Sequence, residues 1–335
     1  MLLIITNAAD IHPNPVAEIL NERKIPFFRL NTDRLLTDYD ICWKFDEKKF
    51  SFTIKYKRFP LEIRSDQVSS VWERRPMEPL ATYDEITDEH IRRTVLEEAD
   101  GFLRFFRYAL AGMDVLWIGH PINERFAGSK IIQKMVAQRV GMNIPKTLFS
   151  NNLEDLTIFG DEDIALKPIS SFDIPLDEKN SIVFYTQRLK TEQFRNLGEQ
   201  SFRNTINFLE TYSEKAYELR VTVICGRFFT AKVHSQNQKE NEGATDWRQG
   251  YDHGIVFEGV ETPLEIMDKC LSFLSYFNLE FGCFDFIRNT KGELIFLECN
   301  TNGQWLWLEE EAKLPISKTL ADIFIEAYEK HDYQS

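Results

Sequence analysis

The chain of 335 residues lacks several features that would place it directly in a functional class. Its five cysteines form no Cys-x-x-Cys pair and no metal-type Cys/His spacing, so we expect buried thiols in a reducing compartment. No segment approaches the roughly 20 apolar residues of a membrane span. Neither GxxxxGK[S/T] nor GxGxxG is present, which excludes the two common glycine-rich phosphate loops.

Positive charges are fewer than negative ones, with 40 Lys and Arg against 53 Asp and Glu. The formal net charge is -13, so bulk electrostatics give the chain no means of binding nucleic acid. The first residues, "MLLIITNAAD", lack the basic start and the long apolar region of a signal peptide. We therefore expect a cytoplasmic protein whose partners include neither nucleic acid nor a membrane.

The apolar pattern of the first third predicts an open α/β sheet. Residues 2–6 form a buried strand, 14–25 a helix and 26–33 a second strand, which is a βαβ opening. The pattern then predicts a hairpin, a strand, a long helix and a strand, at 41–56, 68–76, 86–111 and 114–121. Because the pattern changes after His120-Pro121, we expect an N-terminal domain at 1–119.

The remainder predicts an α+β arrangement in two parts, 120–206 and 207–335. A helix should cover 123–141 and stop at Gly141, since glycine is favoured just past a helix end. A strand ends near Lys167, and residues 206–236 are β-rich with a turn at 225–227. The polar segment 237–254, "NQKENEGATDWRQGYDHG", is expected to be a mobile loop. Helices at 262–277 and 317–330 flank a hairpin over 281–300.

This last hairpin carries an unusual set of oxygen ligands. With Thr290-Lys291 at the tip, Asp285 lies opposite Phe296 and one diagonal step from Glu298. Asp285, Glu298 and Asn300 then project from one face, at a diagonal spacing of roughly 7–8 Å. Such hard oxygen ligands suit Mg²⁺, which takes one or two carboxylates together with substrate phosphates. The alternative is a solvated polar edge.

Isolated cations on separate elements could contact a polyphosphate. Lys130 lies near a helix start, Lys167 ends the strand "IALKP", and Arg220 lies in "AYELRVTV". A lysine offers phosphate a point charge and an arginine offers a planar fork. Each cation alone is more simply a surface charge, but together with the carboxylate hairpin they indicate a nucleotide site.

The order of these elements, with "INFLETYSEKAYELR" between them, resembles an ATP-grasp ligase over about residues 120–310. The N-terminal βαβ region is similar to the pre-ATP domain of these enzymes. The resemblance implies that ATP is clamped between two α+β subdomains and that magnesium, two ions by the family pattern, is held by Asp285, Glu298 and Asn300. It further implies nucleotide contacts from Lys130, Lys167, Lys215, Glu218 and Arg220, and an adenine hinge at Glu210, Thr211 and Tyr212.

Three further stretches, "VWERRP", "SQ…TDWR" and "ECNTNGQW", resemble the maturases of microviridin-type peptides, also called graspetides. By that resemblance the partner is a precursor peptide with a leader segment, the activity is formation of ω-ester or ω-amide crosslinks, and the enzyme is a homodimer. The polar loop would engage the leader. The peptide-contacting residues would be Arg74, Arg75, Ser235, Gln236, Asp246, Trp247 and Arg248.

The expected chemistry needs no protein nucleophile. A peptide carboxylate takes the γ-phosphoryl group and a hydroxyl or amine then displaces phosphate, so positioning and charge neutralisation dominate. Arg220 and Arg248 are our candidates for stabilising the developing charge, beside the metal-binding Asp285, Glu298 and Asn300. No general base is identifiable, and His234 and Asp246 are the nearest candidates.

Other functions are compatible with parts of this sequence pattern. An ATP-grasp ligase that adds amino acids to a small molecule or protein tail would share the same nucleotide site. A peptide-binding protein that has lost its chemistry is disfavoured because the ligand set is complete. For Arg74 and Arg75, an exposed, salt-bridged strand end is as acceptable as peptide recognition.

Overall fold

The structure is a computed structural model that describes residues 1–335 except 48–49, 171–172, 176–180, 238–244, 247–253 and 333–335. The first region is a parallel sheet in the order β2-β1-β6-β7, with an antiparallel sheet β3-β4-β5 beside it. Its strands are β1 Leu2–Thr6, β2 Phe27–Asn31, β3 Tyr39–Phe45, β4 Phe50–Tyr56, β5 Glu62–Arg64, β6 Ser70–Glu73 and β7 Leu116–Ile118.

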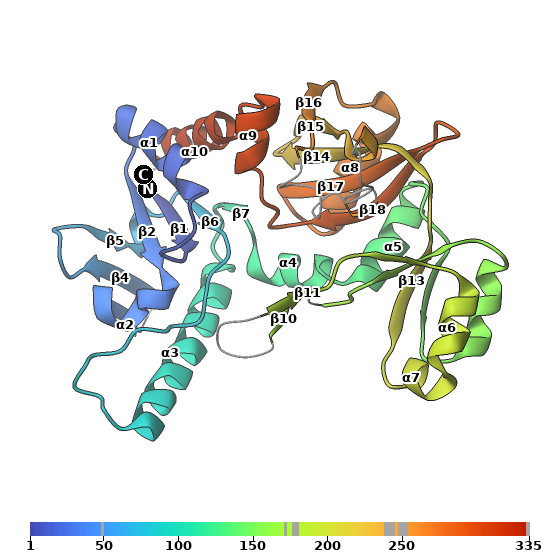
Figure 1. The fold of residues 1–335 in the computed structure, drawn as a ribbon. Coiled ribbons are helices and arrows are strands. Elements are labelled where there is room, and N and C mark those ends of the chain that lie inside the picture. Colours follow the sequence, from blue (N-terminus) through green and yellow to red (C-terminus); the bar gives the residue numbers. More distant parts are fainter. Residues whose placement is uncertain (48–49, 171–172, 176–180, 238–244, 247–253, 333–335) are drawn as a thin grey trace.

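Helices cover both faces of this parallel sheet, which explains why β1 is buried at every position. Alternate residues of β1 enter two different cores, because successive side chains of a strand point to opposite faces. Leu2 and Ile4 pack with α1 (Pro13–Glu22) and α10 (Ile316–Asp332), whereas Leu3 and Ile5 pack with α3 (Glu89–Leu110) and β3–β5. The C-terminal helix α10 therefore returns to the N-terminal sheet, as Figure 1 shows.

The expected helix over 123–141 is wrong in one respect, because the structure has two helices there. Helix α4 (Pro121–Ala127) ends at Gly128, and α5 (Lys130–Arg139) begins after Ser129. The Ser129 hydroxyl accepts a hydrogen bond from the Ile132 amide, which is the N-cap arrangement that starts a new helix. Gly141 does end the segment, with a positive φ of 76°.

The second region is an antiparallel sheet in the order β12-β9-β13-β8. Its core joins Ile164 and Leu209 to the short helices on one face. The elements are β8 Thr147–Ser150, η3 Leu153–Phe159, β9 Ile164–Lys167, β12 Gln187–Leu189, α6 Thr191–Leu197, α7 Glu199–Arg203 and β13 Asn207–Thr211, with a separate hairpin of β10 Asp173–Pro175 and β11 Ser181–Val183.

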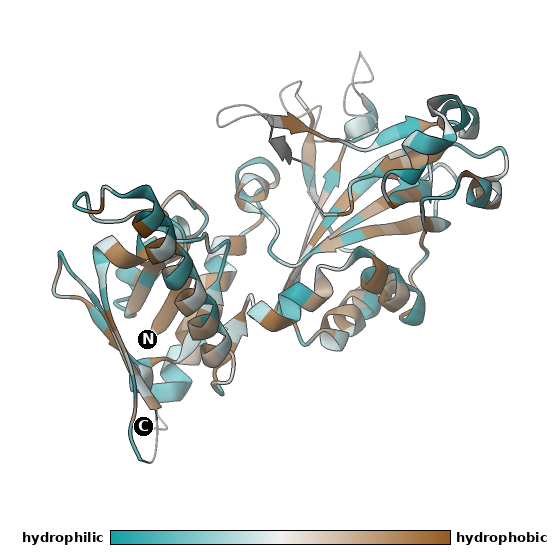
Figure 2. Cartoon of the chain, turned by 90° about the horizontal axis from the view of Figure 1, so that it is seen from below, coloured by the Kyte–Doolittle hydropathy of each residue, from teal (hydrophilic) through white to brown (hydrophobic). Residues whose placement is uncertain are grey.

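The third region is a five-stranded antiparallel sheet in the order β16-β15-β14-β17-β18. Phe284 packs against Phe273 of α8 (Leu264–Tyr276), and Phe286 belongs to the same core, so Asp285 between them points from the opposite face. In Figure 2 brown and teal alternate along several strands, as this two-faced arrangement requires. The strands are β14 Lys215–Ile224, β15 Arg227–Val233, β16 Phe257–Val260, β17 Phe281–Asn289 and β18 Leu294–Asn300.

Short elements complete the described chain. Helices η1 (Thr32–Arg34) and α2 (Leu35–Asp38) follow β2, and η2 (Ser65–Gln67) precedes β6. Helix η4 (Ser235–Asn237) follows β15, and α9 (Leu306–Ala312) joins β18 to α10.

All five cysteines are free thiols, and Cys270, Cys283 and Cys299 are buried. Across the described ranges, no helix is both long and apolar enough to cross a bilayer.

Candidate active site

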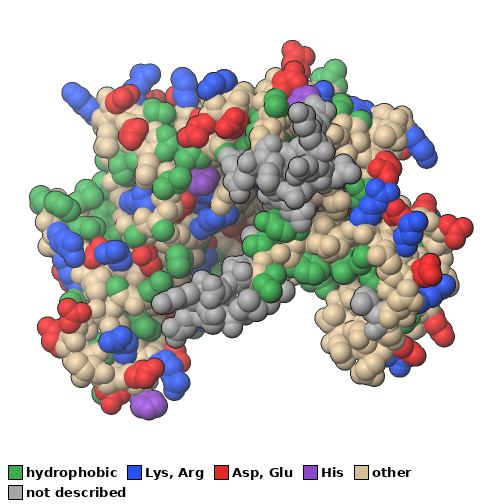
Figure 3. Space-filling model, viewed as in Figure 1, with side chains coloured by type: hydrophobic (Ala, Val, Ile, Leu, Met, Phe, Trp, Pro, Cys, Tyr) green, Lys and Arg blue, Asp and Glu red, His purple; other side chains and the backbone are tan. Residues whose placement is uncertain are grey.

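A cavity of about 520 Å³ lies between the second and third regions, within the range of about 300–1,000 Å³ typical of small-molecule sites. The surface is hollowed between the N-terminal lobe and the lobe of β8–β13 (Figure 3). Most of the residues selected from the sequence line the cavity. They are Arg75, Lys130, Lys167, Glu210, Thr211, Tyr212, Lys215, Glu218, Arg220, Asp246, Asp285, Glu298 and Asn300.

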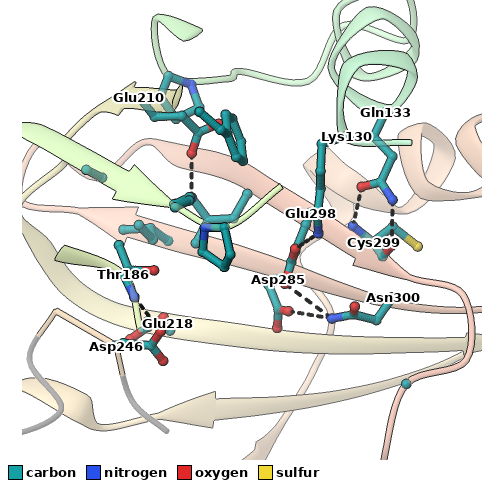
Figure 4. Close-up of a pocket in the computed structure, with 18 of the residues that line it drawn as sticks. Lys130, Gln133, Thr186, Glu210, Glu218, Asp246, Asp285, Glu298, Cys299 and Asn300 are labelled. Carbon is teal, nitrogen blue, oxygen red and sulfur yellow. Dashed lines mark hydrogen bonds and ion pairs between the residues drawn. The ribbon is translucent and has the colours of Figure 1, made fainter. Parts of the chain in front are cut away.

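The three predicted metal ligands do converge on one face of the β17–β18 hairpin. Asp285 pairs directly with Glu298 across the ladder, and Cys283 pairs with Asn300. The Asn300 Nδ2 donates to Asp285 Oδ2 at 3.4 Å and to Glu298 Oε1 at 3.3 Å. Figure 4 shows these side chains pointing toward one another, so the arrangement gathers two carboxylates and an amide.

The register that brings them together differs from the one we predicted, and two irregularities set it. The Asn289 amide donates to Glu293, and Gly292 has a φ of 83°, so the turn contains one more residue than expected. Continued regularly, that turn would place Asp285 opposite Leu297 and turn Glu298 to the other face. A β-bulge between Asp285 and Phe286 shifts the pairing by one residue and restores Glu298 to the cavity face.

Two cations lie against this acidic face. The Arg220 Nη1 of β14 donates to both Asp285 oxygens, at 2.9 and 2.7 Å, and Lys130 at the start of α5 forms an ion pair with Glu298. Burial raises the pKa of Asp285 against the pull of Arg220, and the nearby Glu298 raises it further. Two close carboxylates that disfavour each other's ionisation form a site that a divalent cation would stabilise. The donor set thus fits Mg²⁺.

A buried Lys–Glu–Lys group centred on Glu210 lies beside this acidic face. The Glu210 carboxylate is 1% exposed and forms ion pairs with Lys167 of β9 and Lys134 of α5. Burial would raise the pKa of Glu210, but Lys167 and Lys134 together hold it below its usual value. Burial lowers the pKa of Lys134 to about 8. Sequence reasoning missed Lys134, although its spacing of four residues from Lys130 places both on one helix side.

The backbone of the predicted adenine hinge is partly committed to the fold. The Thr211 amide donates to the Lys146 carbonyl at 2.9 Å, and the Tyr212 amide donates to the Asp163 carbonyl at 2.7 Å. These two amides are therefore already used within the fold. If Glu210, Thr211 and Tyr212 bind an adenine mainly through backbone groups, as predicted, they must use other groups than these.

Residues of β14 and the following segments close the end of the cavity. Glu218 Oε1 accepts from Lys215 Nζ and from the Ser235 hydroxyl, both at 2.9 Å. Lys215 Nζ also donates to the Thr245 carbonyl at 2.8 Å. The buried Asp246 accepts from the Thr186 amide at 3.3 Å. These contacts tie the predicted residues Lys215, Glu218 and Ser235 into one connected group, and Lys215 also holds Thr245, which precedes Asp246 in the chain.

Arg74 and Arg75 are adjacent but have different surroundings. Arg74 is 1% exposed, which contradicts an exposed strand end, and its Nε lies 3.1 Å from Asp10 Oδ2. Its Nη1 donates to the Gly303 carbonyl at 3.1 Å. Arg75, with a φ of 49°, turns into the cavity, where both Nη atoms donate to Gln304 Oε1 at 2.7 and 3.1 Å in the amide orientation that satisfies both side chains.

The chain is similar to known proteins in both sequence and fold. Residues 1–124 match the family model described as the MvdD pre-ATP grasp domain. No protein with a curated description matches by sequence. Among solved structures, a RiPP-associated ATP-grasp ligase of Chryseobacterium gregarium, in complex with ADP and a leader and core peptide, has a TM-score of 0.85 at 24% identity, covering 97% of this chain and 96% of that chain.

Two macrocyclases from Microcystis aeruginosa MRC are also similar over nearly their whole length. MdnC, bound with precursor peptide MdnA, has a TM-score of 0.80 at 26% identity, covering 97% of this chain and 99% of its own. MdnB has a TM-score of 0.72 at 28% identity, with coverage of 96% and 98%. The chain is an ATP-grasp ligase.

Several predicted residues of the ligase do not join the described site. Trp247, Arg248 and most of the predicted polar loop lie outside the described residues. Gln236 lies in η4, where its Nε2 donates to the Ser235 hydroxyl at 3.3 Å. Of the two candidate bases, Asp246 lines the cavity, whereas His234 forms an exposed ion pair with Glu258 at 3.0 Å and does not line it.

Proposed function

We propose that this ATP-grasp ligase is a macrocyclase of a ribosomally made precursor peptide. It would activate Asp or Glu side chains of the peptide and join them to Ser/Thr hydroxyls or Lys amines as ω-esters or ω-amides. The observation that carries the proposal is the paired Asp285 and Glu298, flanked by Arg220 and Lys130, in a chain that aligns along its length with peptide macrocyclases.

The nucleotide would bind in the cavity between the two antiparallel sheets. Lys130 of α5, Lys167 of β9 and Arg220 of β14 all line it, so three cations from separate elements are available to a triphosphate. The adenine would lie along Glu210, Thr211 and Tyr212, using hinge groups other than the two committed amides. Lys215 and Glu218 would border the adenine and ribose.

Asp285, Glu298 and Asn300 would hold magnesium, and we propose two ions, as the family pattern implies. When bound, magnesium neutralises charge on the transferred phosphoryl group. Arg220 already contacts Asp285, so its guanidinium lies where it can contact both a metal ligand and a phosphate oxygen. Arg248 would add a second guanidinium from the segment between β15 and β16.

The reaction proceeds in two displacements. An oxygen of the peptide carboxylate attacks the γ-phosphorus of ATP, the bond to the bridging oxygen breaks, and ADP leaves. The peptide's hydroxyl or amine then attacks the acyl carbon, loses its proton and displaces inorganic phosphate. Asp246 is the candidate acceptor for that proton among the described residues that line the cavity. His234 is less suitable because its ring is paired with Glu258 outside the cavity.

Peptide recognition is proposed for one of the two adjacent arginines. Arg75 projects into the cavity on the side of Gln304 and can bind an acidic side chain through its planar fork. Arg74 is buried on Asp10 and Gly303, so we assign it to the structure of the site and not to the peptide. Ser235, Gln236, Asp246, Trp247 and Arg248 would border the path of the peptide and its leader.

The proposal includes a division of the chain into three parts. Residues 1–119 form the pre-ATP domain, 120–206 the central subdomain and 207–335 the C-terminal subdomain with the metal ligands. Helix α10 belongs to the last part in sequence and packs on the first in space. A homodimer, implied by the family resemblance, is the proposed assembly and can be tested by sedimentation.

Mass spectrometry of a co-expressed neighbouring precursor peptide tests the function. Each crosslink formed within the peptide removes one water, so a macrocyclase lowers the peptide mass in steps of one water. A ligase that adds amino acids raises the mass instead. Ring closure would be refuted if the peptide mass rises when ATP is present. It would also be refuted if the peptide mass stays unchanged while the enzyme consumes ATP.

A further inference from the structure

The strand that carries Glu298 and Asn300 is at the edge of its sheet. Within the part of the chain that the structure describes, β18 pairs with β17 on one side only, and no strand lies along the backbone groups of its other side. Buried backbone groups require partners, and proteins commonly cover or pair such an edge. What covers this edge therefore determines how firmly the two ligands are held.

Helix α5 and the residue Asn143 that follows it supply these partners. The side-chain amide of Gln133 binds Cys299 twice, with Nε2 donating to its carbonyl at 2.8 Å and Oε1 accepting from its amide at 2.9 Å. Lys134 Nζ donates to the carbonyl of Leu297 at the bulge, at 2.8 Å. Asn143 completes the row through Phe296 and Leu294, at 2.8 and 3.3 Å.

Cys299 is the residue between the two metal ligands. Because side chains alternate along a strand, its thiol points into the core while Glu298 and Asn300 point into the cavity. Fixing both the amide and the carbonyl of Cys299 fixes the planes of the two peptide groups that orient its neighbours. Gln133 is 2% exposed, and its Nε2 is itself held by the Ala127 carbonyl at 2.7 Å. Figure 4 shows this amide meeting Cys299 beside Glu298.

We propose that Gln133 is a positioning residue for the metal ligands Glu298 and Asn300. The inference rests on the proposed magnesium site and goes beyond it by assigning the support of that site to α5. The same helix begins with Lys130, which pairs with Glu298 from the cavity side. Helix α5 thus contacts β18 on both its backbone edge and its catalytic face.

The test is the affinity of the purified protein for Mn²⁺ in the presence of ADP, measured by electron paramagnetic resonance. Gln133→Met keeps the length of the side chain and removes its hydrogen bonds. Loss of a group that orients a metal ligand typically weakens metal binding by about 10- to 100-fold, and we expect a weakening in this range. Gln138→Met, an exposed position on the same helix, should bind Mn²⁺ as the wild type does.

Two further variants separate positioning from general weakening of the edge. Asn143→Ala removes an edge contact at Leu294, far along β18 from the ligands, and should leave Mn²⁺ affinity within about twofold of wild type. Gln133→Asn keeps an amide that is too short to reach both Cys299 groups. It should weaken Mn²⁺ binding as Gln133→Met does, and it serves if that variant does not fold.

The outcomes are distinguishable. Wild-type Mn²⁺ affinity in both folded Gln133 variants would overturn the positioning role while leaving the metal site intact. Equal weakening by Asn143→Ala would also overturn it, because the effect would then belong to the whole edge. If the wild-type protein and Glu298→Gln bind Mn²⁺ equally, the proposed metal site itself fails.

Discussion

Glu124 is a buried carboxyl whose ionisation should strongly affect the stability of this protein. It lies on α4, where its Oε2 accepts from Asn302 Nδ2 at 3.2 Å, and no described hydrogen bond reaches its buried Oε1. Burial raises the pKa of Glu124 to about 8, and the nearby Glu73 carboxylate, itself paired with Arg107, raises it as well. The protein therefore folds with Glu124 protonated at neutral pH.

The sign and size of the effect follow from this shift. In the unfolded chain Glu124 ionises near its ordinary pKa of 4.5, whereas in the folded chain it keeps its proton to about pH 8. Its contribution to stability is complete below pH 4.5 and is lost as pH rises through about 8. At about 1.4 kcal/mol per pKa unit, the loss between about pH 5.5 and about pH 8.5 is about 3 kcal/mol.

Glu124→Gln removes this titration while keeping the shape of the side chain. The difference in free energy of unfolding between variant and wild type should shift by about 3 kcal/mol in favour of the variant over that range. Urea unfolding followed by tryptophan fluorescence at a series of pH values measures it. Glu98→Gln, exposed on α3, is the matched control and should parallel the wild type. A difference that stays constant with pH would refute the protonated state of Glu124.

Four substitutions test the active site and the residues that support it. Glu298→Gln should lower turnover by about 100-fold or more, since even outer partners of metal ligands cost up to about 100-fold, while peptide binding measured by calorimetry is retained. Gly303→Ala places a Cβ 2.7 Å from both Cβ and Sγ of the buried Cys283 and 2.9 Å from Arg220 Nη2, so the segment at Gly303 and the Arg220 guanidinium must move apart. This displacement should lower kcat by about 100-fold, and unchanged turnover would contradict it. Arg75→Gln should raise the KM for the peptide about 10-fold or more with kcat little changed. Arg74→Gln should instead lower the free energy of unfolding by about 3–5 kcal/mol, measured by thermal unfolding.

Local patterns in the sequence were sufficient for much of the fold. The buried run of β1, the βαβ opening and the 281–300 hairpin follow from hydrophobic periodicity and turn residues. The same period of two placed Glu298 and Asn300 on one face. The break at Gly128-Ser129 was missed because the apolar spacing continues across it, although glycine followed by serine is itself a stop and start signal.

Register and long-range partners could not be predicted in this way. The bulge at Leu297 depends on Lys134, from a helix more than 160 residues earlier in the chain. The burial of Arg74 was not predicted, because its partners, Asp10 and Gly303, are also distant in sequence. Hydrogen bonds between such residues leave no periodic signal, so only the folded chain brings them together.

The sequence by itself determined which residues are candidates for the chemistry, because carboxylates, an amide and cations at strand and helix ends can be identified from residue type and period. The tertiary structure decided how they meet. It set Asp285 directly opposite Glu298, buried Arg74 while exposing Arg75 to the cavity, and placed Gln133 against Cys299. The reason is physical: side-chain direction is a local property of the backbone, whereas burial and pairing depend on chain segments that only folding brings into contact.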